Sequence, residues 1–131
     1  MRGFDHERLD AYQAALDFVV LANTIIAQLP RGRSHLADQL HRSATSVCLN
    51  IAEGAGEFST RDKARFYRVA QRSATESAAI LDVFARVGGS DPSMLASGRE
   101  LLLRLVAMLT RLAKKSEDGG ARAAGGSGGG E

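Results

Sequence analysis

The residues best suited to chemistry lie in one stretch, Leu49 to Glu76, which reads LNIAEGAGEFSTRDKARFYRVAQRSATE. An amide (Asn50) and a carboxylate (Glu53) precede two glycines, and a run of arginines follows them. This combination suits acid–base catalysis or phosphate binding, and it is equally typical of a helix that simply ends at a glycine. Each interpretation requires further residues at a defined spacing.

Those further residues are missing for a phosphate loop, a metal site or a catalytic centre. The segment EGAGE lacks the Gly-Lys-Ser/Thr of a P-loop and follows no predicted strand. Di-metal sites in helical bundles use Glu-x-x-His pairs, and none occurs here. His6, His35 and His41 share no metal-ligand spacing with one another or with Cys48. We therefore predict no metal, no cofactor, no catalytic residue and no enzymatic activity.

The four arginines after the glycines share one face of a predicted helix. They are Arg61, Arg65, Arg68 and Arg72, at spacings i, i+4, i+7 and i+11. At about 100° per residue they span about 60° of the helix surface. The segment 61–72 holds five basic residues and one acidic residue, a net charge of +4. This arginine strip fits the phosphate backbone of RNA or DNA, and it also fits an ordinary solvated face.

A second polar stripe is here called the polar seam. It runs beside the apolar stripe of the predicted helix that precedes the two glycines, and it continues on the helix that carries the arginine strip. Its predicted members are Gln39, Arg42, Ser46, Asn50, Glu53, Ser73 and Glu76. A carboxylate or an amide near a core is costly unless it is hydrogen-bonded, so the seam predicts a structural polar network or a subunit contact. The alternative is a solvated boundary between core and surface.

Helical periodicity positions both features. Apolar residues recur at steps of three and four in four segments, which predicts helices over about residues 5–29, 34–53, 60–87 and 92–115. Pro30 is expected to stop the first helix, and Gly54 to end the second with a positive-φ cap. Ser59 is the expected N-cap of the third helix, and Asp91 with Pro92 begins the fourth.

Helices of similar length joined by short loops pack antiparallel. We therefore predict an all-α, up-down-up-down four-helix bundle over residues 1–115. Residues 116–131 are glycine-rich and are predicted to form a flexible, disordered tail. A single cysteine, an N-terminus without signal-peptide character and the lack of a long apolar run predict a cytoplasmic protein without a membrane partner.

The stretch QLHRSATSVCLNIAEGAGEFSTRDKARFYRVAQRSATES resembles a known family. The family comprises bacterial four-helix bundle proteins encoded in intervening sequences of 23S ribosomal RNA genes. The residues that match its pattern are Gln39, Leu40, Arg42, Ser46, Asn50, Ile51, Ala52, Glu53, Gly54, Phe66, Ala70, Ser73 and Glu76. Ser43, Val47 and Arg72 depart from the pattern, and the resemblance covers about residues 6–112.

The resemblance implies an antiparallel bundle, often assembled as a ring-like homopentamer, and it implies no known reaction. A related branch, the accessory variability determinant of diversity-generating retroelements, is a basic pentamer that binds a reverse transcriptase and nucleic acid. This sequence is more similar to the intervening-sequence branch. We expect a non-enzymatic, oligomeric adaptor associated with RNA or DNA, and the alternative is a protein-interaction or self-assembly module with no nucleic-acid role.

Overall fold

The computed structural model describes the backbone of residues 3–130 and the side chains of residues 3–120. This part of the chain is helical and contains no strand, which confirms the all-α prediction. Its elements are the 3-10 helix η1 (Asp5–Arg8) and the α-helices α1 (Asp10–Ala27), α2 (Ser34–Gly56), α3 (Thr60–Val87) and α4 (Pro92–Gly130). None of the helices in the described part is both long and apolar enough to cross a bilayer.

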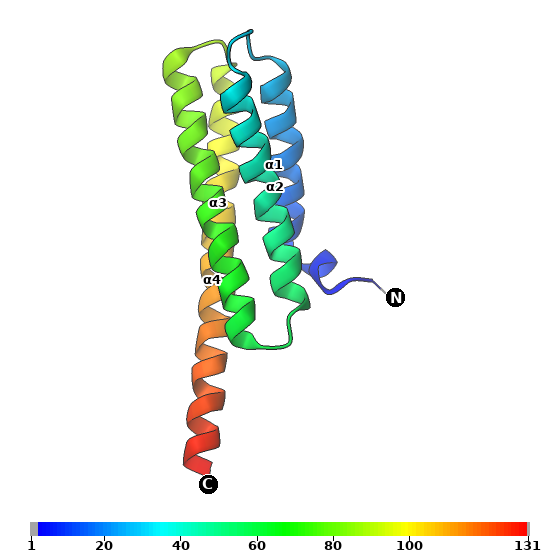
Figure 1. Cartoon of the computed structure of the whole chain (residues 1–131), viewed down its shortest axis with the longest axis vertical. Helices are drawn as coiled ribbons and strands as arrows, with labels where there is room; N and C mark the ends of the chain where they lie inside the picture. The colour runs from blue at the N-terminus through cyan, green and yellow to red at the C-terminus, as the bar shows by residue number, and fades with distance from the viewer. Residues whose placement is uncertain (1–2, 131) are drawn as a thin grey trace.

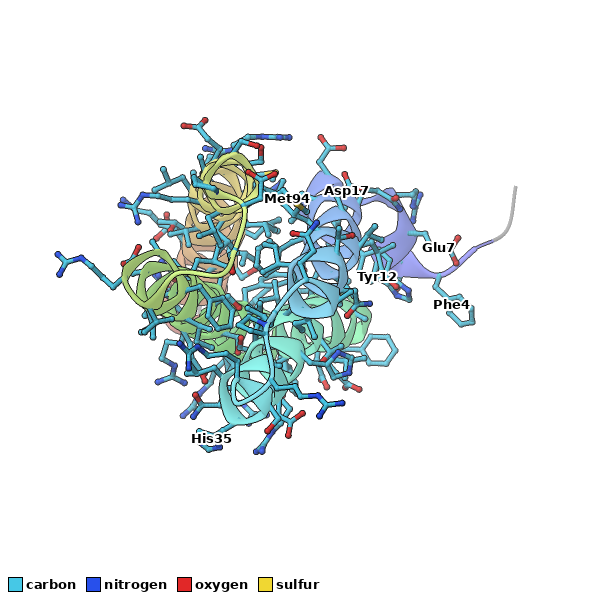
Figure 2. The ribbon with its side chains drawn as sticks, turned by 90° about the horizontal axis from the view of Figure 1, so that it is seen from above. Phe4, Glu7, Tyr12, Asp17, His35 and Met94 are labelled. Carbon is cyan, nitrogen blue, oxygen red and sulfur yellow. The ribbon has the colours of Figure 1, made fainter. Side chains whose placement is uncertain are left out.

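The four helices stand at the corners of a square. Figure 1 shows the α1–α2 and α3–α4 loops at one end of the bundle and the α2–α3 loop at the other end. Each helix therefore runs antiparallel to the one before it. α1 packs against α2 and α4, and α3 packs against the same two helices. Figure 2 shows the side chains of all four helices meeting along the central axis, while the segment with Phe4 and Glu7 lies outside the square.

The core is built mainly from aliphatic side chains on the inner faces of the four helices. Its largest fully buried members are Phe18, Phe84, Ile25, Leu40, Ile51, Leu102, Leu105, Leu109 and Val47. Full burial of one such side chain contributes about 1.5–3 kcal/mol. Because the apolar stripes are continuous along each helix, they determine which faces remain outside and available to a partner.

The ends of α3 and α4 follow their local sequence. The Ser59 hydroxyl accepts the amide hydrogen of Asp62 at 3.3 Å, as expected of an N-cap. Gly88 terminates α3 with a φ of +81°, a conformation that favours glycine. The Asp91 carboxylate accepts the amide of Ser93 at 2.9 Å, just before the first turn of α4.

The predicted first helix, residues 5–29, is divided in the structure. Leu9 has extended backbone angles (φ −85°, ψ 126°), so η1 ends before it and α1 begins after it. The carboxylate of Glu7 accepts the amide of Phe4 at 3.0 Å, which closes η1 as a separate turn. The Gln13 side chain donates to the Glu7 carbonyl at 3.5 Å and holds this turn against α1.

Gly54 is not the positive-φ cap that the sequence predicts. α2 continues through it to Gly56, and the positive φ values among the described residues belong to other glycines. Gly54 is buried beneath Tyr67, where an added Cβ would lie 2.7 Å from the ring carbon Cε1. Glycine stands here because α2 and α3 approach closely, and not because the backbone turns.

α4 is longer than the predicted 92–115. It is helical to Gly130, and Figure 1 shows its last turns extending past the end of the bundle. Glu117 pairs with Arg68, and Gly120 lies against Thr60, so this part of α4 contacts the start of α3. A helix already packed along most of its length propagates at the gain of one hydrogen bond per added residue. The structure therefore has helix up to Gly130 where the sequence predicts a flexible tail over 116–131.

We expect Gly54→Ala to lower the free energy of unfolding by about 1–3 kcal/mol, because the added methyl group overlaps the Tyr67 ring. The matched change Gly56→Ala places its methyl group in open space on the same helix. It is expected to be neutral or stabilising by up to about 1 kcal/mol. Chemical denaturation followed by circular dichroism measures both values, and equal effects of the two changes would contradict the close-approach explanation.

Candidate nucleic-acid interface

The arginine strip lies on the outer surface of the first half of α3. Arg61, Arg65 and Arg72 are exposed, and Arg68 is half-buried. Three of the four arginines line a hollow of about 530 Å³ between α3 and α4. The opposite wall of this hollow consists of Ser116, Glu117 and Gly120. The strip is therefore accessible, and its first three arginines border α4.

Arg68 is already engaged by a carboxylate. Its Nε and Nη2 donate to the two carboxylate oxygens of Glu117, at 3.1 and 2.8 Å, and its Nη1 donates to Gln71 at 3.0 Å. This fork of hydrogen bonds lowers the pKa of the Glu117 carboxyl and raises the pKa of the Arg68 guanidinium. Arg68 therefore joins α3 to α4 and is less available to a phosphate than the sequence predicts.

The other members of the strip are freer. Arg65 lies 3.8 Å from the Asp62 carboxylate, and its guanidinium carbon lies 4.8 Å from the centre of the Phe66 ring. Exposed pairs of this kind contribute little and are weakened by salt. Within the part of the chain with described side chains, Arg61 and Arg72 pair with no carboxylate. Arg61 and Arg72 are thus the members best placed to meet an external anion.

The structure brings a second set of cations beside the strip. Gln71 donates to Thr110 at 2.9 Å and Arg68 meets Glu117, so residues 61–72 of α3 and 104–118 of α4 lie side by side. These two segments, here called the basic half, contain nine basic and three acidic residues, a net charge of +6. The whole chain carries only +2, so the remaining residues carry −4. Positive charge is thus concentrated in these two adjoining segments.

The polar seam divides into an inner and an outer part. In the inner part, the Ser46 and Ser73 hydroxyls lie 2.8 Å apart, and Asn50 donates to the carbonyl and the hydroxyl of Ser46 at 2.8 and 3.1 Å. A deeper pair, Ser43 and Ser77 at 2.7 Å, was not predicted as part of the seam. The recurrence of serines at three- and four-residue steps on both helices is the signal for it. The inner part therefore holds α2 to α3.

A family model described as 23S rRNA-intervening sequence protein matches residues 7–111. The chain belongs to this family. The matched range extends from η1 into α4 and includes both the polar seam and the arginine strip, which confirms the resemblance seen in the sequence. No match is found among curated proteins.

The outer part of the seam in this family member faces solvent. Gln39 is half-buried, and Arg42, Glu53 and Glu76 are exposed. Within residues 3–120, the charged side chains among them, those of Arg42, Glu53 and Glu76, form no ion pair. Leu49, which lies among them on α2, is 64% exposed. These residues do not form the internal network that the sequence predicts, and the prediction of a subunit contact stays open for them.

The remaining groups of chemical interest do not converge. Burial raises the pKa of the Cys48 thiol to about 11, so this thiol stays protonated and a poor nucleophile near neutral pH. Among the described residues, no three His, Cys, Asp or Glu side chains are arranged to hold a metal ion. The basic half and the outer seam are therefore the two surfaces from which a function can be argued.

We expect Arg68→Gln to loosen α4 near Glu117, because this change removes the charged fork that joins α4 to α3. Hydrogen exchange followed by mass spectrometry would show faster exchange in the α4 peptides around residues 112–120. The matched control is Arg61→Gln, which removes a cation of the same strip that has no carboxylate partner in the described part. Equal exchange in the two variants would contradict a tethering role for Arg68.

Proposed function

We propose that this member of the 23S rRNA-intervening sequence protein family is a non-enzymatic RNA-binding protein whose basic half lies along a phosphate backbone. The observation that carries the proposal is the charge separation: a net +6 in two adjoining helix segments of a chain whose total is +2. The description of the family supports an RNA-related context. DNA carries the same phosphate groups, so the binding test below compares RNA with DNA.

The cations proposed to contact phosphate are those of the basic half that no carboxylate holds in the described part of the chain, apart from Lys63, whose ammonium donates to the carbonyls of Gly54 and Ala55. They are Arg61, Arg72, Arg104, Arg111, Lys114 and Lys115. Each contact releases counterions from the nucleic acid, so affinity falls steeply as salt rises. Contacts of this type position a protein on the backbone and do not recognise base sequence. We therefore expect RNA binding that depends strongly on salt and weakly on sequence.

Binding rather than catalysis is proposed because the described residues bring no acid, base and nucleophile together. His35 and His41 project from the outer face of α2, while Cys48 is buried. Figure 2 shows His35 at the outer edge of the bundle. The cations of the basic half are suited to charge neutralisation, a role that requires proximity and no proton transfer.

We expect the double change Arg61→Glu and Arg111→Glu to weaken binding of single-stranded RNA and to lower its salt slope by at least about 1.4, since each lost contact on a single strand accounts for about 0.7. Fluorescence anisotropy over a series of salt concentrations measures both quantities. The matched control is Arg31→Glu with Arg86→Glu, which makes the same change in net charge at the opposite end of the bundle.

If both double variants lose affinity equally, net charge alone governs binding and the basic half is not the interface. If the unmodified protein binds neither RNA nor DNA at low salt, the proposed function is wrong. Equal affinity for RNA and DNA of the same length would support a phosphate-backbone contact and would widen the proposal to both nucleic acids.

A second candidate function is self-assembly, and a specific observation favours it. η1 and the end of α2 carry acidic residues around a hollow of about 340 Å³, which Asp5, Glu53 and Glu57 line. Phe4 at this hollow is largely exposed, and Phe58 in the following loop is fully exposed. An acidic side and a basic side on one chain allow copies to associate head to tail, and closed rings form when the rotation permits. The homopentamer implied by the family resemblance is one such ring.

Self-assembly predicts that Phe58→Ser combined with Leu49→Ser lowers the molar mass measured by light scattering, because both changes remove apolar surface that an interface would bury. The control is Val20→Ser with Leu103→Ser, which removes exposed apolar side chains from α1 and α4. That control should leave the mass unchanged. A monomer at micromolar concentration for the unmodified protein would rule out the assembly.

A further inference from the structure

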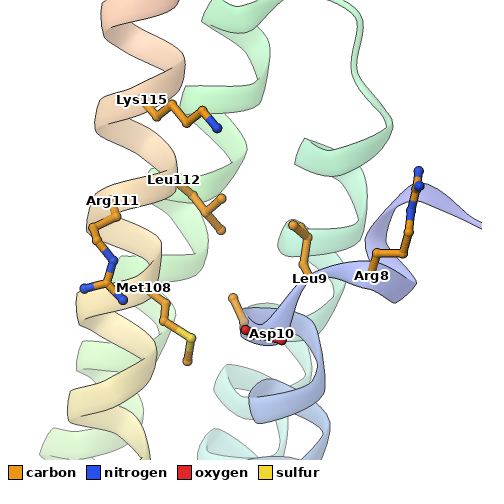
Figure 3. A pocket seen from close by; sticks show the side chains of 8 residues that line it. Arg8, Leu9, Asp10, Met108, Arg111, Leu112 and Lys115 are labelled. Carbon is orange, nitrogen blue, oxygen red and sulfur yellow. The ribbon is translucent and has the colours of Figure 1, made fainter.

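Two hollows adjoin each other on the outer side of α4. The first, of about 330 Å³, lies between α4 and the start of α1 and is shown in Figure 3. Its lining includes Leu9, Asp10, Met108, Arg111, Leu112 and Lys115. The second, of about 480 Å³, lies further along α4, and Arg111 and Lys115 line it as well. These two cations therefore stand between the two hollows.

The first hollow has an apolar floor. Leu9, Met108 and Leu112 are half-buried and pack against the edge of the core. Figure 3 shows Met108 and Leu112 projecting from α4 on one side, with Leu9 and Asp10 facing them from the other. Ligand sites are typically of this kind, with apolar walls and a few polar groups that fix orientation.

The second hollow is cationic. Arg111, Lys114 and Lys115 line it together with one carboxylate, Asp118. None of the three cations is within ion-pair distance of a carboxylate among residues 3–120. Three cations held by neighbouring helix turns attract a compact anion, and a planar guanidinium also stacks on a flat ring.

The start of α1 adds to the polarity at the first hollow. Leu9 precedes the helix and offers no side-chain cap, so the positive end of α1 lies uncapped at the rim. Asp10 is the carboxylate of this rim and suits the hydroxyl or amino hydrogens of a ligand. The two hollows together thus present an apolar slot with a hydrogen-bond acceptor at its rim and an anion site next to it along α4.

We propose that these adjoining hollows bind one unpaired nucleotide of an RNA strand, with the base against Met108 and Leu112 and a phosphate against Arg111, Lys114 and Lys115. The inference rests on the proposed function and specifies its ligand as single-stranded. Free phosphate would leave the apolar slot empty. A duplex keeps its bases stacked and paired, so only an unpaired base reaches the slot.

The direct test compares two RNA strands of equal length, one intact and one abasic, by fluorescence anisotropy at the same salt concentration. Both strands carry the same number of phosphates, so they differ only in the bases. The base adds buried apolar surface to the phosphate contacts that both strands make, and we expect the intact strand to bind about tenfold more tightly.

Met108→Asn locates the contact. It keeps the charge and removes an apolar wall of the slot, so it should abolish the preference for the intact strand and leave abasic binding unchanged. The matched control is Leu103→Asn, an equivalent change at an exposed position of α4 outside both hollows. Photo-cross-linking of a 4-thiouridine strand to the unmodified protein should place the adduct in the peptide from Met108 to Lys115.

Equal affinity for intact and abasic strands, or an adduct confined to α3, would overturn the nucleotide site while salt-dependent binding to the basic half still stood. Equal loss of preference in Met108→Asn and Leu103→Asn would also overturn it. Absence of binding to either strand at low salt would remove the proposed function and the nucleotide site together.

Discussion

The close packing of α3 against both α2 and α4 is the constraint on which the rest of the structure depends. On one side, Gly54 lets the Tyr67 ring lie against the backbone of α2, and two serine pairs join the helices. On the other side, Arg68 and Gln71 bind partners on α4. Because these contacts set the register of three helices, they also determine which charged surfaces adjoin.

Serine pairs between close helices have a particular physical role. A hydroxyl that is buried without a partner is destabilising, whereas two facing hydroxyls satisfy each other at a small volume. Ser43 and Ser77 are almost fully buried, and Ser43 also donates to the Leu40 carbonyl of its own helix, so a shift of α3 along α2 would leave the Ser77 hydroxyl without its partner. Small side chains thus give close approach and register together, and they leave the larger polar groups for the surface.

The surface that results concentrates positive charge on adjoining segments of α3 and α4. Repulsion among the cations of the basic half destabilises the isolated chain to a small degree, and an external anion relieves it. Only part of that repulsion is relieved internally, mainly by Glu117. The acidic side on η1 and α2 borders the basic half, since Lys63 donates to the carbonyls of Gly54 and Ala55 at the end of α2, and Arg8 of η1 lines a hollow together with Arg111. RNA binding and assembly between copies are the two uses that we propose for this distribution of charge.

Local sequence was sufficient for the number of helices, for the caps at Ser59 and Asp91, and for membership of the family, because each depends on neighbours within a few residues or on a contiguous motif. It was insufficient at Gly54, where a glycine needed for helix contact has the same local pattern as a glycine needed for a turn. The arginine strip was visible in the sequence, but the pairing of Arg68 with Glu117 and the juxtaposition with the α4 cations were not. Those features join residues far apart in the chain, and only the packing of α3 on α4 decides them.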